Sequence, residues 1–297
     1  MIYIYIPIYN NAVWCENFSP LPGFCYVASD NASIDGSGDI LRSKGVEVIK
    51  QPTNLGRIGN WKFCVAHFIN SDATWMKWLF AGDELLPDIY KKLERAINAN
   101  PQARLIVGEY EIVEKGLNSH WKMFSETRLI LPEEAMYLAA ERGNWFGSPI
   151  GHCIHREAFI NGFDFGNLEW IADMQFCVGI AVNYPVLYLT EILGKFHMAE
   201  RKYYMAHIQS VFSCVEGALV RRDAAERYRK LTGNDDKFHE LMKLIEKNIE
   251  TSLILRVCKD WSKPDLMQEA IIDAIPTKNI PKIFLKRVIT RLLGRKS

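Results

Sequence analysis

Three polar segments in the first third of the chain follow directly on apolar runs, and their residue types suit ligand binding. Residues 7–10 follow the β-rich run at the N-terminus, residues 30–37 follow a second apolar run, and residues 81–83 follow a third. Carboxylate oxygens bind hard cations such as Mg²⁺ and accept hydrogen bonds, and the same residue types close turns and cap helices. Each segment therefore has both a chemical and a structural interpretation.

The elements that would position these segments alternate between strand-like and helix-like character. Strands are predicted at residues 2–7, 23–29, 46–49 and 75–80, and helices at residues 37–44 and 58–70. This alternation predicts right-handed βαβ units, and therefore an α/β fold with a mixed, mainly parallel sheet flanked by helices. Ligands of such sheets bind beyond the carboxyl ends of the strands. The three polar segments should therefore gather at one edge of the sheet.

The rest of the chain changes from strands to helices. Further strands are predicted at residues 105–110, 150–155 and 186–189, and helices after about residue 210. The apolar residues of one later segment recur at three- and four-residue spacing, which is typical of an amphipathic helix: Leu241, Leu244, Ile245, Ile249 and Leu253. We therefore predict a catalytic α/β domain over 1–210 and a helical C-terminal extension over 211–297.

Composition excludes several classes of protein. The 297 residues are 48% hydrophobic and 24% charged, with a formal net charge of +1. Such a chain is an ordinary globular protein, without the charge excess that a nucleic-acid partner would require. The seven cysteines are an odd number without metal-finger spacing, which favours a reduced, cytoplasmic protein. We find no signal peptide and no run of the ~20 apolar residues that span a bilayer.

Five motifs in order resemble the inverting family-2 glycosyltransferases of the GT-A fold, which build bacterial cell-surface polysaccharides such as lipopolysaccharide. They are IYIPIYNNA, VASDNASIDGSGDIL, NLGRIGNWKFCVA, WMKWLFAGDELLPD and GSPIGHCIHREAFINGFDFGNLEWIADMQFCVGIA. The resemblance covers roughly residues 2–200. It implies a nucleotide-sugar donor, with UDP the favoured nucleotide, and a saccharide or lipid-linked saccharide acceptor.

The resemblance also implies a donor site. Tyr9 would stack on the nucleotide base, Asp30 would accept a hydrogen bond from the uracil N–H, and Arg57 would neutralise phosphate charge. Each has a structural alternative. Tyr9 would then lie at an ordinary strand exit, Asp30 would form an Asx turn or helix cap, and Arg57 would be a solvated arginine at a helix start. The implied nucleotide- and donor-binding residues are Pro7, Tyr9, Asn10, Asp30, Asn31, Arg57, Asn60, Gly82 and Asp83.

Asp83 stands where the family has its acidic metal-binding cluster. The reaction uses Mg²⁺ or Mn²⁺ to stabilise the leaving diphosphate. Phe80 and Gly82 occupy the two other positions that are usually acidic, so Asp83 is expected to hold the ion with little help from the protein. Glu84 should point the opposite way on a strand. The family often has a basic residue or histidine facing the diphosphate or metal at the position of His197. For Asp83, the alternative to a metal-binding role is a plain Gly-Asp turn.

Asp173 matches the catalytic base of the family, which takes the proton of the acceptor hydroxyl. Ala172 replaces the acid that often precedes it, and a helix-start carboxylate favoured by the helix dipole is the alternative. Glu169 is a second, weaker candidate for the base. The residues expected to shape the acceptor pocket are Trp145, Ser148, Glu169 and Trp170, although a tryptophan is equally at home in a core.

The C-terminal segment IPKIFLKRVITRLLGRKS combines apolar and basic residues at helical spacing. A basic amphipathic helix is typical of binding to an anionic membrane surface, so we expect a peripheral location on the inner face of the cell membrane. Docking of its apolar face on the protein's own core is the alternative. For the whole chain, a catalytically inactive nucleotide- or sugar-binding module and an α/β methyltransferase also stay open.

Overall fold

The computed structural model describes residues 1–114, 117–160, 168, 171–198 and 211–259. These residues form two compact units. The first draws on Met1–Pro132, Phe146–Asn167 and Asn183–Arg201, and the second on Glu133–Trp145, Leu168–Val182 and Lys202–Ser297. Each unit thus combines separate stretches of the chain, and the division near residue 210 remains a prediction.

The first unit is built on a sheet whose N-terminal half is parallel. The strands β1 (Ile2–Ile8), β2 (Cys25–Asp30), β3 (Glu47–Lys50) and β4 (Trp75–Trp78) lie in the order β3-β2-β1-β4. All three pairings among them are parallel. The polar segments that follow β1, β2 and β4 consequently leave the sheet at the same edge, as the sequence predicts.

The other half of the sheet mixes directions. Strand β9 (His152–His155) lies antiparallel between β4 and β6 (Leu105–Glu114), and β10 (Val186–His197) runs parallel to β6. The short strands β5 (Glu84–Leu85) and β8 (Arg128–Ile130) pair with β10, and β7 (Leu117–Trp121) pairs with β6. The predicted class, a mixed α/β sheet flanked by helices with a helical C-terminal region, is confirmed.

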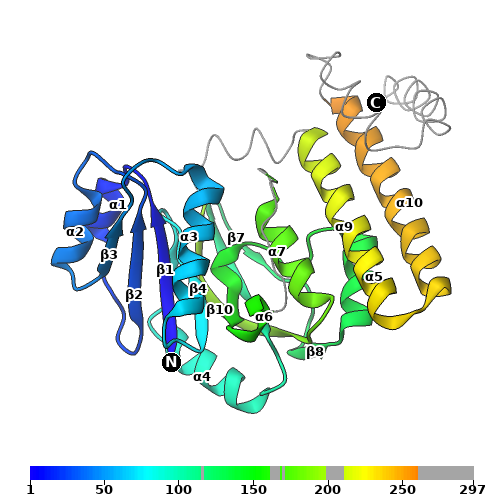
Figure 1. The fold of residues 1–297 in the computed structure, drawn as a ribbon, viewed down its shortest axis with the longest axis horizontal. Coiled ribbons are helices and arrows are strands. Elements are labelled where there is room, and N and C mark those ends of the chain that lie inside the picture. The colour runs from blue at the N-terminus through cyan, green and yellow to red at the C-terminus, as the bar shows by residue number, and fades with distance from the viewer. Residues whose placement is uncertain (115–116, 161–167, 169–170, 199–210, 260–297) are drawn as a thin grey trace. The chain divides into compact units, whose positions relative to one another are not determined.

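Helices of the first unit cover the sheet, as Figure 1 shows for α3 in front of β1. They are α1 (Ala12–Asn17), α2 (Ser37–Ser43), α3 (Gly56–Asn70), α4 (Ile89–Ala99), α6 (Glu157–Ile160) and the 3₁₀ turn η1 (Pro149–Gly151). Helix α3 packs on β1 because the Tyr5 ring lies edge-on to Phe68 and its hydroxyl lies 2.9 Å from Nδ1 of His67. A buried tyrosine thus gains both apolar contact and a polar partner.

The second unit is helical in the described residues. It contains α5 (Pro132–Arg142), α7 (Ala172–Ala181), α9 (Val211–Thr232) and α10 (Asp235–Lys259). Leu241, Ile245 and Ile249 of α10 are buried, which confirms the amphipathic pattern there. Gly233, with φ of 65°, makes the turn between α9 and α10 (Figure 1).

None of the described helices combines the length and the apolar composition that crossing a bilayer requires. The basic tail, residues 280–297, lies outside the described residues. Its expected binding to a membrane surface therefore stays a prediction.

Gly151 gives the first test of the packing between η1 and β6. A Cβ atom at this position would lie 2.4 Å from the carbonyl oxygen of Gly108, a backbone atom that cannot rotate away. We expect Gly151→Ala to lower the free energy of unfolding by about 1–3 kcal/mol, as overpacking does. Urea denaturation measures the change.

Gly217 on α9 supplies the matched control. A Cβ there would meet no atom closer than 3.9 Å, and a helical Gly→Ala substitution gains up to about 1 kcal/mol. Equal effects of the two substitutions would contradict the close approach of η1 to β6.

Candidate functional site

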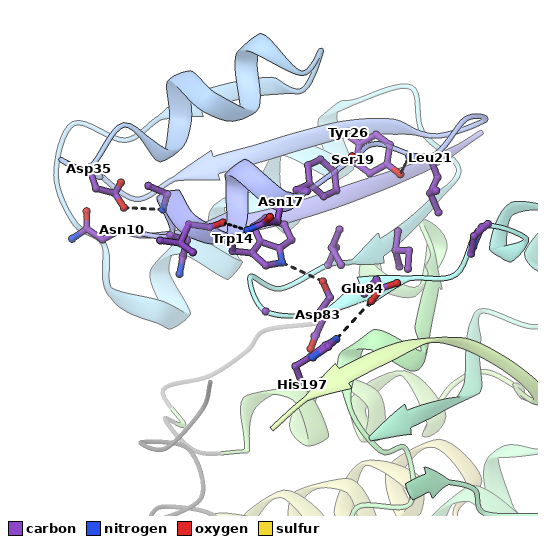
Figure 2. Close-up of a pocket in the computed structure, with 18 residues that line it drawn as sticks. Asn10, Trp14, Asn17, Ser19, Leu21, Tyr26, Asp35, Asp83, Glu84 and His197 are labelled. Carbon is purple, nitrogen blue, oxygen red and sulfur yellow. Dashed lines mark hydrogen bonds and ion pairs between the residues drawn. The ribbon is translucent and has the colours of Figure 1, made fainter. Parts of the chain in front are cut away.

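A pocket of about 900 Å³ opens beside the carboxyl ends of β1 and β4 in the first unit (Figure 2). It is bordered by α1, by the segment around β5 and by the end of β10. Its lining residues are Asn10–Asn11, Ala12–Trp14, Asn17–Ser19, Leu21, Tyr26, Asp35, Leu79, Gly82–Leu85, Pro87 and His197. Asn10, Gly82, Asp83 and His197, which the sequence predicts for the site, therefore border a common space.

Side-chain hydrogen bonds tie the loop after β1 to the loop after β2. The Asn10 Oδ1 accepts the N–H of Ile34 at 3.0 Å, and the Asp35 Oδ2 accepts the N–H of Ala12 at 2.9 Å. Asn10 has φ of 51°, a conformation that asparagine tolerates better than most residues. Burial acts to raise the pKa of Asp35, but hydrogen bonds from Ser37 and Ala12 outweigh it and lower the pKa. The wall of the pocket is thus fixed by polar contacts.

Asp30 and Asn31, predicted to bind the nucleotide, also shape the loops. Asp30 is buried, and its Oδ1 accepts the N–H of Ser33, three residues on, at 2.9 Å, a local bond that closes the loop as a capping side chain does. The Asn31 amide donates to Oδ1 of Asn54, and its oxygen accepts the N–H of Leu55. These residues hold the loops after β2 and β3 together, and their role toward a nucleotide stays a prediction.

Asn60 makes separate, buried hydrogen bonds to the end of β2. Its Nδ2 donates to the carbonyl oxygen of Ser29 at 3.1 Å, while the Ser29 hydroxyl donates to its Oδ1. Both side chains are buried. Asn60 therefore anchors α3 to the end of β2, and it does not line the pocket.

Tyr9 and Arg57 lie at the surface. Tyr9 is 48% exposed. Pro7, two residues earlier, lies in β1 and pairs with Ser29 of β2. The Arg57 guanidinium lies 5.3 Å from the centre of the Trp61 ring, and that ring stacks on Phe80 at 4.8 Å. Phe80, the residue in place of a family acid, thus belongs to an aromatic stack beside Asp83.

Asp83 occupies a defined turn between β4 and β5. Gly82 has φ of 99°, which suits only glycine, and the Asp83 N–H donates to the carbonyl oxygen of Phe80 at 2.9 Å. Trp14 Nε1–H donates to the Asp83 carbonyl at 3.3 Å (Figure 2). Asp83 is 3% exposed. The Gly-Asp turn and a position on the pocket wall are therefore both present.

Strand β10 brings His197 and Lys195 to the segment after β4. Lys195 Nζ lies 3.0 Å from Glu84 Oε1, and His197 Nε2 lies 3.8 Å from Glu84 Oε2 (Figure 2). Sequence reasoning gave Glu84 little weight because it points away from Asp83. The pairing of β5 with β10 is a contact between distant segments, and no local pattern signals it.

The pocket offers a sparse set of ligands for a metal ion. Among the described residues, no three His, Cys, Asp or Glu side chains come together in a geometry that could hold one. Asp83 and His197 nevertheless border the same pocket. Mg²⁺ keeps several waters and is often held by one or two carboxylates plus substrate phosphates. The donor set thus fits an ion that the diphosphate helps to bind.

Lys77 on β4 places a buried ammonium near this turn. Its Nζ donates to the carbonyl oxygens of Ile150 and His152, and the residue is fully buried. Burial lowers the pKa of Lys77 to about 8, while the negative charge of Asp83 acts to raise it. The positive charge of Lys77 is therefore poised to respond to pH.

Lys77 makes stability depend on pH in a defined direction. Its pKa is about 8 in the folded chain against 10.5 ordinarily, so between these values the unfolded chain binds more protons and stability rises with pH. We expect the free energy of unfolding to gain about 2 kcal/mol between pH ~7.5 and ~9.5, relative to the Lys77→Met variant. Urea denaturation of both proteins at the two pH values measures this gain. An equal change in the free energy of unfolding for wild type and Lys77→Met would contradict the lowered pKa of Lys77.

The predicted acceptor residues fall in different parts of the chain. Ser148 of the first unit is buried, its N–H donates to the Tyr110 hydroxyl, and its Oγ has no hydrogen-bond partner among the described residues. Trp145 of the second unit is 1% exposed and donates its Nε1–H to the Ala135 carbonyl. That geometry favours the core role of Trp145 over a sugar platform. Glu169 and Trp170 lie outside the described residues.

Asp173, the predicted base, lies in the first turn of α7 in the second unit. The residue is partly exposed, and its Oδ1 accepts the N–H of Met174 at 2.8 Å. A carboxylate in this position is favoured by the helix dipole. The dipole interaction and a catalytic role are compatible, and the catalytic role stays a prediction.

Comparison with known proteins gives a match in structure alone. No family model and no curated protein matches the sequence. Residues 1–349 of TarS from S. aureus, in complex with UDP, superpose with a TM-score of 0.59 at 13% identity, over 95% of this chain and 77% of TarS 1–349. The complex of TarS 1–349 with UDP-GlcNAc gives 0.55 at 11% identity, over 99% of this chain and 92% of the other. This chain has the fold of these GT-A glycosyltransferases.

Proposed function

We propose that this chain is an inverting family-2 glycosyltransferase that moves a sugar from a nucleotide-sugar donor to a saccharide or lipid-linked saccharide acceptor. UDP is the favoured nucleotide, and the pathway is the synthesis of a bacterial surface polysaccharide such as lipopolysaccharide. We place the enzyme in the cytoplasm, with residues 280–297 attaching it to the inner face of the membrane.

One observation carries the proposal: the pocket that Asn10, Asp83 and His197 border lies at the carboxyl ends of the parallel strands. In open α/β sheets this is where ligands bind. The same fold holds UDP and UDP-GlcNAc in TarS. A nucleotide sugar is therefore the ligand class that position and fold both support.

The donor residues contact different parts of the nucleotide. Tyr9 is exposed and offers a flat ring to the base, and Asp30 stands at the end of β2 as an acceptor for the base N–H. Arg57, in the first turn of α3, supplies positive charge for the diphosphate. Asn31 and Asn60 hold these loops in place through their buried amide contacts.

Asp83 and His197 would hold Mg²⁺ or Mn²⁺ together with the diphosphate oxygens. When bound, such an ion stabilises the negative charge that develops on the leaving diphosphate. Asp83 supplies the carboxylate, His197 supplies an imidazole nitrogen, and Lys195 adds positive charge at the same end of β10. Because few protein ligands take part, we expect weak metal affinity.

Asp173 acts as the general base in the proposed mechanism. The acceptor hydroxyl attacks the anomeric carbon opposite the departing diphosphate, and the Asp173 carboxylate takes the hydroxyl proton. The new glycosidic bond forms as the bond to the diphosphate breaks, so the configuration inverts. Ser148, with its buried hydroxyl, is proposed to contact the acceptor.

Thermal denaturation with added nucleotides tests the donor. We expect UDP with Mn²⁺ to raise the melting temperature, because a ligand at about 100 times its Kd stabilises by about 2.7 kcal/mol. S-adenosylmethionine, the donor of an α/β methyltransferase, should have no effect. The proposal would be refuted if only S-adenosylmethionine raised the melting temperature, or if no nucleotide raised it.

A catalytically inactive binding module is the second candidate. The stack of Trp61 on Phe80 in place of an acid, and the sparse ligand set, favour it. Release of UDP from a nucleotide sugar in the presence of an acceptor separates the two. Binding without turnover would favour the module.

A further inference from the structure

A row of polar side chains crosses strands β5, β10, β6 and β7, starting at the pocket. Glu84 pairs with Lys195, Lys195 with Glu111, and Glu111 with His120. Residues paired directly across a sheet point to the same face. We call these four residues the polar row. With ~4.8 Å between strands, it extends ~14 Å from Glu84 to His120.

His120, at the outer end of the row, is held by a buried carboxylate. Its Nε2 lies 2.7 Å from Glu109 Oε2, and the side chains of His120 and Glu109 are 38% and 5% exposed. The carboxylate accepts the proton of Nε2–H, so this contact fixes the ring and leaves Nδ1 for a second hydrogen bond. The imidazole therefore combines a fixed orientation with access to solvent.

Tyr188 fixes Glu109 in turn. The Tyr188 hydroxyl donates to Glu109 Oε1 at 2.6 Å and accepts the N–H of Met123 at 2.8 Å. Burial and the contact with Glu109 raise the pKa of Tyr188 to about 12, so this hydroxyl stays a donor. Both oxygens of Glu109 are thus occupied by side chains from neighbouring strands.

Burying the Glu109 carboxylate costs free energy, so stability alone does not explain the arrangement. Removing a carboxylate from water costs several kcal/mol unless charge and hydrogen bonds compensate. An exposed cross-strand ion pair such as Lys195–Glu84, by contrast, contributes little. A buried carboxylate that orients one accessible imidazole is better explained by a ligand that the imidazole contacts.

The charges of the row identify the class of ligand. Acidic and basic side chains alternate along it, from Glu84 through Lys195 and Glu111 to His120. The carboxylates of Glu84, Glu111 and Glu109 outnumber the one ammonium group, that of Lys195, which disfavours an anion and favours a neutral, hydroxyl-rich molecule. Its length exceeds that of a single sugar ring.

We propose that the polar row binds the hydroxyl groups of a neutral oligosaccharide acceptor, with His120 as its outermost contact. The inference rests on the proposed glycosyltransferase function. The acceptor end nearest the pocket meets Glu84 and Lys195, and the sugar units farther from the reacting hydroxyl meet Glu111 and His120.

The test compares acceptors of different length on the full-length protein. Wild type and His120→Gln receive UDP-sugars with mono-, di- and trisaccharides of glucose, galactose and N-acetylglucosamine, and UDP release is followed. We expect the KM for a trisaccharide to rise about tenfold in the variant, the loss of one hydrogen bond. The KM for a monosaccharide should not change. His239→Gln, at an exposed position of α10, is the matched control.

Each outcome decides between the two proposals. If UDP neither binds nor is released under any condition, the proposed function fails. If UDP-sugar is turned over but no saccharide accelerates UDP release, or the trisaccharide KM is equal in wild type and His120→Gln, the inference about the polar row is overturned. A purely structural role would change KM for all acceptor lengths alike.

A second measurement covers a variant that fails to fold. In wild-type protein with labelled histidine and bound UDP, the imidazole resonance of His120 should shift on addition of a trisaccharide that the enzyme uses. The corresponding monosaccharide should leave it in place. An unchanged resonance with the trisaccharide would overturn the inference.

Discussion

Asp173→Asn is expected to bind the nucleotide donor as the wild type does and to lose transfer activity by about 10²–10⁴-fold, the usual contribution of a positioned general base. The amide has the size of the carboxylate but cannot take the proton of the acceptor hydroxyl. It can still accept the N–H of Met174 through its oxygen. The start of α7 should therefore be preserved.

Two measurements make this prediction specific. Thermal shift with UDP reports donor binding, and release of UDP in the presence of acceptor reports transfer. Asp223→Asn is the matched control, because Asp223 lies on α9 in an exposed pair with Arg227. Near wild-type turnover by Asp173→Asn would remove Asp173 from the role of base.

Asp83→Asn is expected to lower the rate of transfer by roughly 10²–10³-fold, the range found when one electrostatic contact to the developing charge is removed. Asp83 is the one carboxylate left in the segment that resembles the glycosyltransferase metal-binding cluster, where Phe80 and Gly82 stand at the other two positions. Higher Mn²⁺ should restore part of the rate, because the diphosphate and water supply the remaining ligands.

A metal titration at fixed donor concentration checks this second prediction. The half-saturating Mn²⁺ concentration should rise in Asp83→Asn and stay constant in Asp39→Asn, whose carboxylate is exposed on α2 beside Arg42. Thermal denaturation of both variants controls for folding, because Asp83 also acts on the charge of buried Lys77. An unaltered metal dependence would show that Asp83 is not a metal ligand.

Local patterns in the sequence were sufficient for the parallel half of the sheet. The apolar runs at the N-terminus and before Asp30 are β1 and β2, and the polar residues that end them lie at one edge. Strands and their ends depend mostly on nearby residues: apolar runs bury, and Asp, Asn and Gly close turns. The common location of Asn10 and Asp83 follows from these signals and the rules of βαβ connection.

Contacts between distant segments could not be predicted in the same way. The sequence correctly places a strand near residues 152–155, but it does not show that β9 runs antiparallel between β4 and β6. Nor does it show that Glu84 pairs with Lys195, a residue 111 positions away. Strand direction and register are decided by which surfaces bury each other, and these surfaces come from separate parts of the chain.

The same distinction applies to single residues of the site. The residue type of Asp83 and the resemblance of its segment to the glycosyltransferase motif made it a candidate metal ligand, and its turn with Gly82 follows from local chemistry. Burial decided the others: Lys77 lies wholly inside the sheet, Trp145 is enclosed, and Glu109 fixes His120 from below the surface. Burial depends on which distant segments pack around a residue. The positions of the acidic residues could therefore be read from the sequence, whereas the burial of each side chain is decided by the folded structure.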